Sequence, residues 1–158
     1  MNSFVLFRNA KIHYNDYGKG KPIVLLHGFL ENSTMWHNFI PLWSKKNRII
    51  TVDLLGHGLT ENIGYVHSME LMAEAVFEVL LHLKIKKATL IGHSMGGYVA
   101  LAFAELFPQM INGLCLMNST TKPDSKDKQI NRDRAIEAVK QNHKMFVRVS
   151  ITNLFRPK

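Results

Sequence analysis

Two runs of consecutive apolar residues limit most strongly the folds that are open to this 158-residue chain. They lie within residues 22–27 and 48–53 and lack the apolar–polar alternation of a strand with one wet face. Strands that are buried on both faces have this pattern, and they occur in parallel sheets. Stretches with helical periodicity alternate with the strand-like segments. The sequence therefore predicts an α/β fold, with a mostly parallel sheet and flanking helices.

The remaining elements follow from local signals. Six strands are expected, at residues 3–8, 11–17, 22–27, 48–53, 87–92 and 111–117. Three helices are expected, at residues 33–44, 68–83 and 95–107. The first two strands predict an antiparallel N-terminal hairpin with a tight turn at Asn9 and Ala10. Ser68 is the expected N-cap of the second helix, and Pro41 predicts a kink or an early end in the first.

The pattern changes after Asn118. A polar loop is expected at residues 120–127, with Asp124 as a candidate N-cap. One or two amphipathic helices should then run to about Phe155, and no further strand is evident. We therefore divide the chain into a sheet-containing part, residues 1–119, and a helical segment, residues 120–158.

A serine between two glycines stands where a predicted strand meets a predicted helix. Ser94 is preceded by Gly92 and followed by Gly96, in the pattern Gly-x-Ser-x-Gly. In a sharp strand-to-helix turn, this pattern lifts the serine hydroxyl above the sheet and strains the serine backbone. The glycines are needed because strand and helix approach closely there, and the helix N-terminus faces the reacting oxygen. We therefore expect Ser94 to be a nucleophile with a strained backbone.

A second motif, His27-Gly28-Phe29, ends the strand at residues 22–27. Two converging backbone N–H groups can stabilise the negative charge that develops on an acyl oxygen. One of them is expected from Met95, directly after the serine. The other is expected from Phe29, because Gly28 lets its loop turn close to the site, and His27 and Gly28 are supporting residues.

A third motif, Asp53-x-x-Gly56-His57-Gly58, follows the strand at residues 48–53. Its aspartate is expected to orient neighbouring loops by hydrogen bonds, and its histidine is expected to be structural. In this order and spacing, the three motifs resemble the α/β-hydrolase superfamily, with most likeness to small bacterial esterases and carbon–carbon-bond hydrolases. The resemblance extends from Ser3 to about Ser119 and implies an incomplete sheet of that fold.

The resemblance also implies an acid and a histidine after the serine in the chain. Asp133 and His143 respect that order, but no predicted strand between them would hold the histidine near Ser94. His93 adjoins the serine and is expected to point away from it. We therefore expect the chain to be the N-terminal part of such a hydrolase, ending in its helical cap, with the acid and the base beyond Lys158.

The function implied by the resemblance is that of a serine hydrolase without cofactor or metal, acting on a small ester or related acyl substrate. The chain by itself is expected to be a poor or inactive enzyme. Two alternatives remain open: a carbon–carbon-bond hydrolase or lyase on the same site, and a non-catalytic binding member of the fold. Phe29, Leu30 and Met95 predict an apolar pocket.

The charge and the composition bear on partners. The formal net charge is +8, and residues 121–158 hold ten of the 20 Lys and Arg residues but four of the 12 Asp and Glu residues. These bases are spaced along predicted helices, which favours a solvated face over a nucleic-acid or membrane partner. The single cysteine, Cys115, argues against a disulfide framework and a cysteine zinc site. With neither a signal pattern nor a membrane-length apolar run, a cytoplasmic protein is expected.

The strand at residues 111–117 predicts a homodimer. In the superfamily fold it pairs with a later strand, which we do not expect here, so unpaired backbone groups would lie beside Leu114 and Leu116. Trp36 and Trp43 would also be uncovered. Two copies joined at this edge, or by exchanged C-terminal helices, would cover these surfaces, whereas the alternative is that the same helices fold back over the sheet. Light scattering at micromolar concentration should give the mass of a dimer, and a monomer would contradict this prediction.

Overall fold

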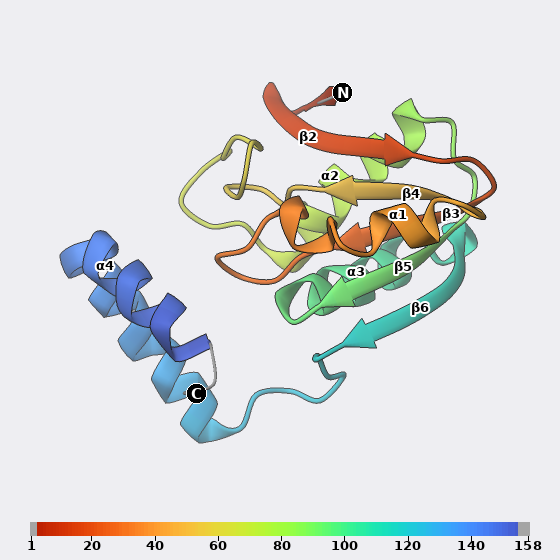
Figure 1. Ribbon diagram of the computed structural model, residues 1–158. Helices are drawn as coiled ribbons and strands as arrows, with labels where there is room; N and C mark the ends of the chain where they lie inside the picture. The colour runs from red at the N-terminus through yellow and green to blue at the C-terminus, as the bar shows by residue number, and fades with distance from the viewer. Residues whose placement is uncertain (1–2, 155–158) are drawn as a thin grey trace. The chain divides into compact units, whose positions relative to one another are not determined.

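The computed structural model describes residues 3–154 and contains a six-stranded mixed sheet with helices on both faces (Figure 1). The strands are β1 (Ser3–Phe7), β2 (Ala10–Tyr17), β3 (Lys21–Leu26), β4 (Asn47–Val52), β5 (Ala88–His93) and β6 (Ile111–Met117). Their order across the sheet is β1-β2-β4-β3-β5-β6. The pairs β1–β2 and β2–β4 are antiparallel, while β4, β3, β5 and β6 run parallel. The predicted α/β class and the N-terminal hairpin are confirmed.

The hairpin turn lies one residue earlier than predicted. Arg8 and Asn9 have φ angles of 48° and 67°, while Ala10 already pairs with Phe7 in the ladder. Positive φ at both central residues is the geometry of a type I′ turn, whose twist matches that of the flanking strands. The expected turn at Asn9 and Ala10 is therefore wrong by one position.

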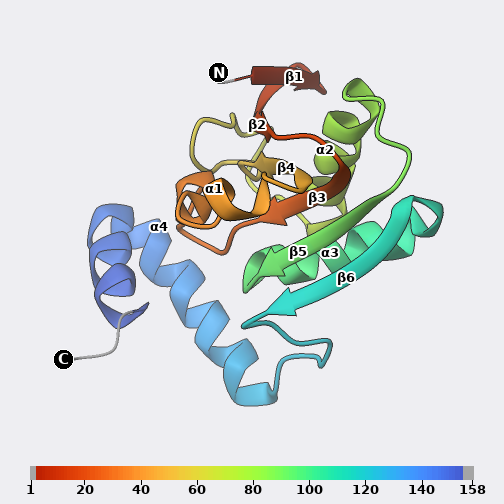
Figure 2. The same cartoon turned by 45° about the vertical axis from the view of Figure 1, so that its right-hand side comes forward.

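The connections place the ends of β3 and β5 side by side at the centre of the sheet. The helical elements of this part are η1 (Ser33–Trp36), α1 (Ile40–Trp43), α2 (Met69–His82), α3 (Met95–Leu106) and η2 (Pro108–Met110). From β3 the chain moves outward to β4, then crosses back over β3 to β5 and β6. Helix α1 and helices α2 and α3 lie on opposite faces of the sheet (Figures 1 and 2). In such sheets the carboxyl ends of the strands where the direction reverses are where sites form.

The single helix expected at residues 33–44 is two short segments. The side chain of Asn32 accepts a hydrogen bond from the Thr34 N–H group and starts the 3₁₀ turn η1. Pro41 then occupies the first turn of α1, where its missing N–H group leaves no helical bond unmade. Proline inside one continuous helix would remove such a bond, so the early break is the outcome that Pro41 predicted.

Alternate residues of the strands supply the two cores, one on each face. On the face of α2 and α3, the strand residues Val24, Leu26 and Ile50 lie in a large apolar cluster with residues of both helices. On the other face, Leu25 and Ile49 pack with Trp36 and Ile40.

The expectation that Trp36 would be uncovered is wrong. Its side chain is fully buried against the sheet, and Trp43 is partly buried beside it. The Trp36 ring packs with Leu25 and Ile49 of the strands.

The ends of the long helices agree with their sequence signals. The Ser68 hydroxyl accepts a hydrogen bond from the Leu71 N–H group at the start of α2, which confirms the predicted N-cap. Helix α3 ends at Leu106, next to Pro108, which opens η2. A proline this close after a helix end cannot continue the helix.

A second compact unit divides from the sheet between Thr121 and Lys122. It contains α4 (Lys126–Leu154), two helices joined at Asn142, whose φ of −156° and ψ of 87° are not helical. Asp124 is not the N-cap that was expected. The Ser125 hydroxyl accepts from the Lys128 N–H group instead, and Asp124 pairs with Arg132.

Three further features bear on the predictions. The predicted end of the C-terminal amphipathic helices at about Phe155 lies outside the described residues. Within the described residues, none of the helices is both long enough and apolar enough to cross a membrane. The described strand partner of β6 is β5, which leaves the other edge of β6 open beside the 39%-exposed Leu114.

Candidate active site

Ser94 lies in the turn between β5 and α3 with an unfavourable backbone conformation. Its φ is 50° and its ψ is −114°, a region that side-chain-bearing residues rarely occupy. Such a conformation costs about 1–3 kcal/mol and persists only where the surroundings enforce it. The predicted strain is confirmed.

Strand β6 and the loop after it hold Ser94 from both sides. The Ser94 N–H group donates to the Met117 carbonyl oxygen at 3.0 Å. The Ser94 carbonyl oxygen accepts from the Ser119 hydroxyl at 2.9 Å and from the Gly97 N–H group at 3.0 Å. Because both backbone polar groups of the serine are bonded, the strained conformation is over-determined.

The glycines of the motif are required by close packing. A Cβ atom on Gly92 would collide with the Gly96 carbonyl oxygen and lie 2.6 Å from the Gly97 Cα atom. A Cβ atom on Gly96 would lie 2.6 Å from the His27 carbonyl oxygen. The predicted close approach at Gly92 and Gly96 is confirmed, and the helix start is pressed against the end of β3.

The loop after β3 is a tight turn with a second strained residue. Leu30 has a φ of 60°, and the Glu31 N–H group closes the turn on the Gly28 carbonyl oxygen at 3.3 Å. The Phe29 side chain is 50% exposed.

Two backbone N–H groups of these loops are unoccupied. Within residues 3–154, no hydrogen bond is recorded for the N–H groups of Phe29 and Met95. For Met95 this follows from its place at the start of α3, where the first N–H groups of a helix have no partner within the helix. Both groups are therefore available to an incoming oxygen atom.

His27 has a structural role. Its ring is fully buried, with Nδ1 at 2.8 Å from the Gly28 carbonyl oxygen and Nε2 accepting from the Leu54 N–H group at 2.9 Å. Burial lowers the pKa of His27, which favours the neutral ring that these two partners require. Because both ring nitrogens are occupied, His27 joins the loops after β3 and β4 and is not free to move a proton.

Asp53 organises the loops on the other side of β3. Its carboxylate accepts from the N–H groups of Ser33 at 2.7 Å and Leu59 at 2.9 Å, and Oδ2 lies 2.9 Å from Nδ1 of His13. Burial acts to raise the pKa of Asp53, but the N–H groups of Leu59 and Ser33 outweigh it, and the net pKa lies below its ordinary value. Gly58 makes the approach feasible, because a Cβ atom there would lie 2.9 Å from Asp53 Oδ1. The predicted loop-orienting role of Asp53 is confirmed.

His57 packs against the proposed oxyanion loop. Its ring lies 6.0 Å from the Phe29 ring in an edge-on arrangement and 5.3 Å from the His27 ring. Its Nδ1 atom is 3.0 Å from the Leu55 carbonyl oxygen. These contacts agree with the structural role that was predicted for it.

Several histidines of the described residues have hydrogen-bond partners other than the Ser94 hydroxyl. Across residues 3–154, no histidine is recorded in a hydrogen bond to the Ser94 hydroxyl. The Nδ1 atom of the neighbouring His93 pairs with Glu31 at 3.0 Å, so His93 is engaged elsewhere, as was expected. Asp133 and His143 both lie on α4, in the other unit.

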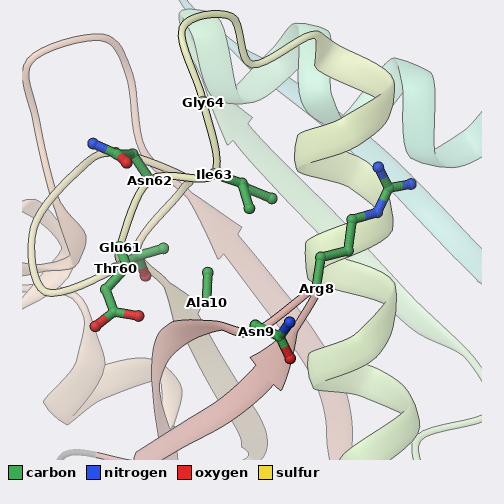
Figure 3. A pocket seen from close by; sticks show the side chains of 9 residues that line it. Arg8, Asn9, Ala10, Thr60, Glu61, Asn62, Ile63 and Gly64 are labelled. Atoms are coloured by element: carbon green, nitrogen blue, oxygen red, sulfur yellow. The ribbon is translucent and has the colours of Figure 1, made fainter.

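Two cavities lie away from Ser94. One, of about 760 Å³, lies between the β1–β2 turn and the loop that carries Thr60 to Gly64 (Figure 3). Its Arg8 side chain extends to Glu74 on α2, with which it pairs at 2.6 Å. The other, of about 580 Å³, is lined by His13, Asn15 and Asp53 among others. Neither cavity includes Ser94, Phe29 or Met95.

Known proteins are similar to this chain in sequence and in fold. The sequence model of the family described as the alpha/beta hydrolase fold matches residues 21–143. The chain belongs to this family. Its fold is also that of a solved thermophilic esterase from Thermogutta terrifontis with malate bound, at a TM-score of 0.82 and 33% identity over 90% of this chain and 54% of that one.

Two of the sequence relatives with a named activity are hydrolases. One is the (E)-2-((N-methylformamido)methylene)succinate hydrolase of Acinetobacter baylyi, 28% identical over 87% of this chain and 52% of its own length. The other is the 2-hydroxy-6-oxo-2,4-heptadienoate hydrolase of Pseudomonas putida, 33% identical over 73% of this chain and 43% of its own length. The chain therefore spans about half the length of these relatives.

Sequence reasoning missed four residues of this hydrolase fold. Ser119 is the second residue after β6 and was detectable as a polar residue near the carboxyl end of a parallel strand. His13 and Asn15 were detectable as polar residues that alternate with the buried Ile12 and Tyr14 along β2. Glu31 carried no such signal, because a glutamate in a surface loop is usually solvated.

The first prediction from this geometry concerns the turn at Ser94. Gly92→Ala should lower the free energy of unfolding by about 3 kcal/mol or more, because its Cβ atom would overlap backbone atoms that cannot move aside. Gly113→Ala on the adjacent strand β6 is the matched control. Its Cβ atom would meet Thr89 Oγ1 at 3.4 Å, an ordinary contact. Urea denaturation of both variants measures the difference, and equal stabilities would contradict the packing at the turn.

The second prediction concerns Asp53 and acid. A carboxyl group with a lowered pKa in the folded state stabilises the fold at neutral pH, and this contribution is lost as the pH falls below the ordinary value of 3.8 and through the folded-state pKa. Asp53→Asn should cost about 2–4 kcal/mol at pH 7 and flatten the acid limb of the stability profile. The exposed Glu105, replaced by Gln, is the control. Chemical denaturation at pH values from about 2 to 7 measures the stability of both variants. Parallel profiles of stability against pH for D53N and the parent would contradict the prediction.

Proposed function

We propose that this chain carries the nucleophile and the oxyanion hole of a serine hydrolase that acts on a small ester or related acyl compound. The observation that supports it most is the strained Ser94 backbone beside two unoccupied N–H groups, those of Phe29 and Met95. A turn that only packs does not need a strained serine, and strain of this kind collects at functional sites.

The proposed chemistry divides the work among these groups. The Ser94 hydroxyl oxygen forms a bond to the acyl carbon, and its proton goes to a histidine base. The N–H groups of Phe29 and Met95 bind the oxygen that becomes negative. The leaving group departs with a proton, and water then releases the acyl group from Ser94. In this proposal the histidine and its acid partner lie outside the described residues.

Two other functions use the same residues. Carbon–carbon-bond hydrolysis is favoured by the relative from Pseudomonas putida that is named a heptadienoate hydrolase, and in that reaction the leaving group is a carbanion that must be protonated. A non-catalytic binding protein of this fold is the other alternative. The strained Ser94 argues against it, because binding alone gives no reason to maintain strain of about 1–3 kcal/mol.

A fluorophosphonate probe tests the proposal. We expect slow labelling of the chain, confined to Ser94 by peptide mass spectrometry, and no labelling of Ser94→Ala. Turnover of p-nitrophenyl acetate should be weak, because the oxyanion hole and binding alone supply residual catalysis. Labelling that survives in Ser94→Ala would refute the nucleophile. Rapid turnover that disappears in Ser94→Ala would retain the nucleophile but show that the base lies within the chain.

A further inference from the structure

One carboxylate oxygen joins the two loops that carry the proposed oxyanion donors. Oε2 of Glu31 accepts from the Gly28 N–H group at 2.6 Å and lies 3.0 Å from Nδ1 of His93. Gly28 belongs to the loop after β3, and His93 is the last residue of β5. The bridge therefore spans 62 residues of sequence and connects the sides of the site through a single atom.

The bridge is closely built. A Cβ atom on Gly28 would lie 2.7 Å from Glu31 Oε2 and 3.1 Å from His93 Nδ1, so a side chain at this position would displace the Glu31 carboxylate. The side chains of His93 and Glu31 are 20% and 28% exposed, so water only partly screens their pairing. Hydrogen bonds to an ionised carboxylate are shorter and stronger than neutral ones.

The bridge lies directly beside the proposed donors. Glu31 occupies the Gly28 N–H group, whereas the adjacent Phe29 N–H group has no hydrogen-bond partner among residues 3–154. Phe29 follows Gly28 by one residue, and Met95 follows His93 by two. A change in the Glu31 bridge therefore shifts the two donors relative to each other.

We propose that Glu31 is a positioning residue that sets the separation of the Phe29 and Met95 N–H groups by holding Gly28 and His93 together. The inference rests on the proposed function, in which these N–H groups bind the oxyanion.

The test measures the rate at which Ser94 reacts with diisopropyl fluorophosphate. In this reaction a bond forms between Ser94 Oγ and phosphorus, fluoride leaves, and the hydroxyl proton goes to the buffer. The phosphoryl oxygen of the adduct then occupies the oxyanion hole. Intact-protein mass spectrometry gives the second-order rate constant without requiring turnover.

Three variants separate positioning from stability. Glu31→Ala removes the bridge and should slow labelling about tenfold or more, because small displacements of reacting groups have large effects on rate. Glu31→Gln keeps an oxygen acceptor for the Gly28 N–H group and should retain most of the rate. Glu61→Ala is the matched control, since Glu61 accepts from the Lys11 N–H group at 2.8 Å, at a position remote in sequence from both loops.

A second measurement does not depend on reactivity. Hydrogen exchange of the Gly28 amide should be faster in Glu31→Ala than in the parent chain and largely restored in Glu31→Gln. Unchanged exchange in Glu31→Ala would show that the bridge does not form and would overturn the inference.

The outcomes also separate this inference from the proposed function. Labelling of Glu31→Ala at the parent rate overturns the positioning role and leaves the nucleophile intact. An equal loss of rate in Glu31→Ala and Glu61→Ala would indicate general destabilisation and also overturn it. Labelling at a residue other than Ser94, or no labelling of the parent chain, refutes the proposed function and the inference with it.

Discussion

The backbone of Ser94 is the constraint on which the rest of the site depends. The backbone conformation of this residue, with a φ of 50° and a ψ of −114°, is unfavourable and persists only where neighbouring residues enforce it. Strand β6 and the loop after it do so, because Met117 and Ser119 make hydrogen bonds to the N–H group and the carbonyl oxygen of Ser94. Strand β3 contributes by packing its end against Gly96. Three adjacent parallel strands are therefore needed to maintain one turn.

Buried polar side chains perform the corresponding task for the loops around that turn. His27 connects the loops after β3 and β4, and Asp53 connects β2, η1 and the loop that follows β4. Hydrogen bonds of this kind are strong where water is excluded, and an unpaired polar group there is costly. The network therefore favours one arrangement of the loops over others. The loop that carries the exposed Phe29 is held by the Gly28 carbonyl oxygen, which lies within hydrogen-bond distance of the His27 ring and accepts from the Glu31 N–H group.

Family membership and the geometry of the site give different information about this protein. Membership in the alpha/beta hydrolase fold family fixes the architecture of the sheet and its helices. The named relatives act on chemically different compounds, a substituted succinate and a heptadienoate. A shared fold is compatible with both, because substrate choice depends on the residues of the site and not on the fold.

The sequence by itself determined the strand and helix order, the Gly-x-Ser-x-Gly turn and the need for glycine at positions 92 and 96. These depend on local backbone sterics and on apolar periodicity, which neighbouring residues encode. It misplaced the hairpin turn by one residue and left Trp36 uncovered, because strand register and the burial of a side chain depend on pairing and packing across the sheet. Only the tertiary structure decided that Glu31 meets His93 and that Ser119 bonds Ser94, since these partners are 62 and 25 residues apart and no local pattern links them.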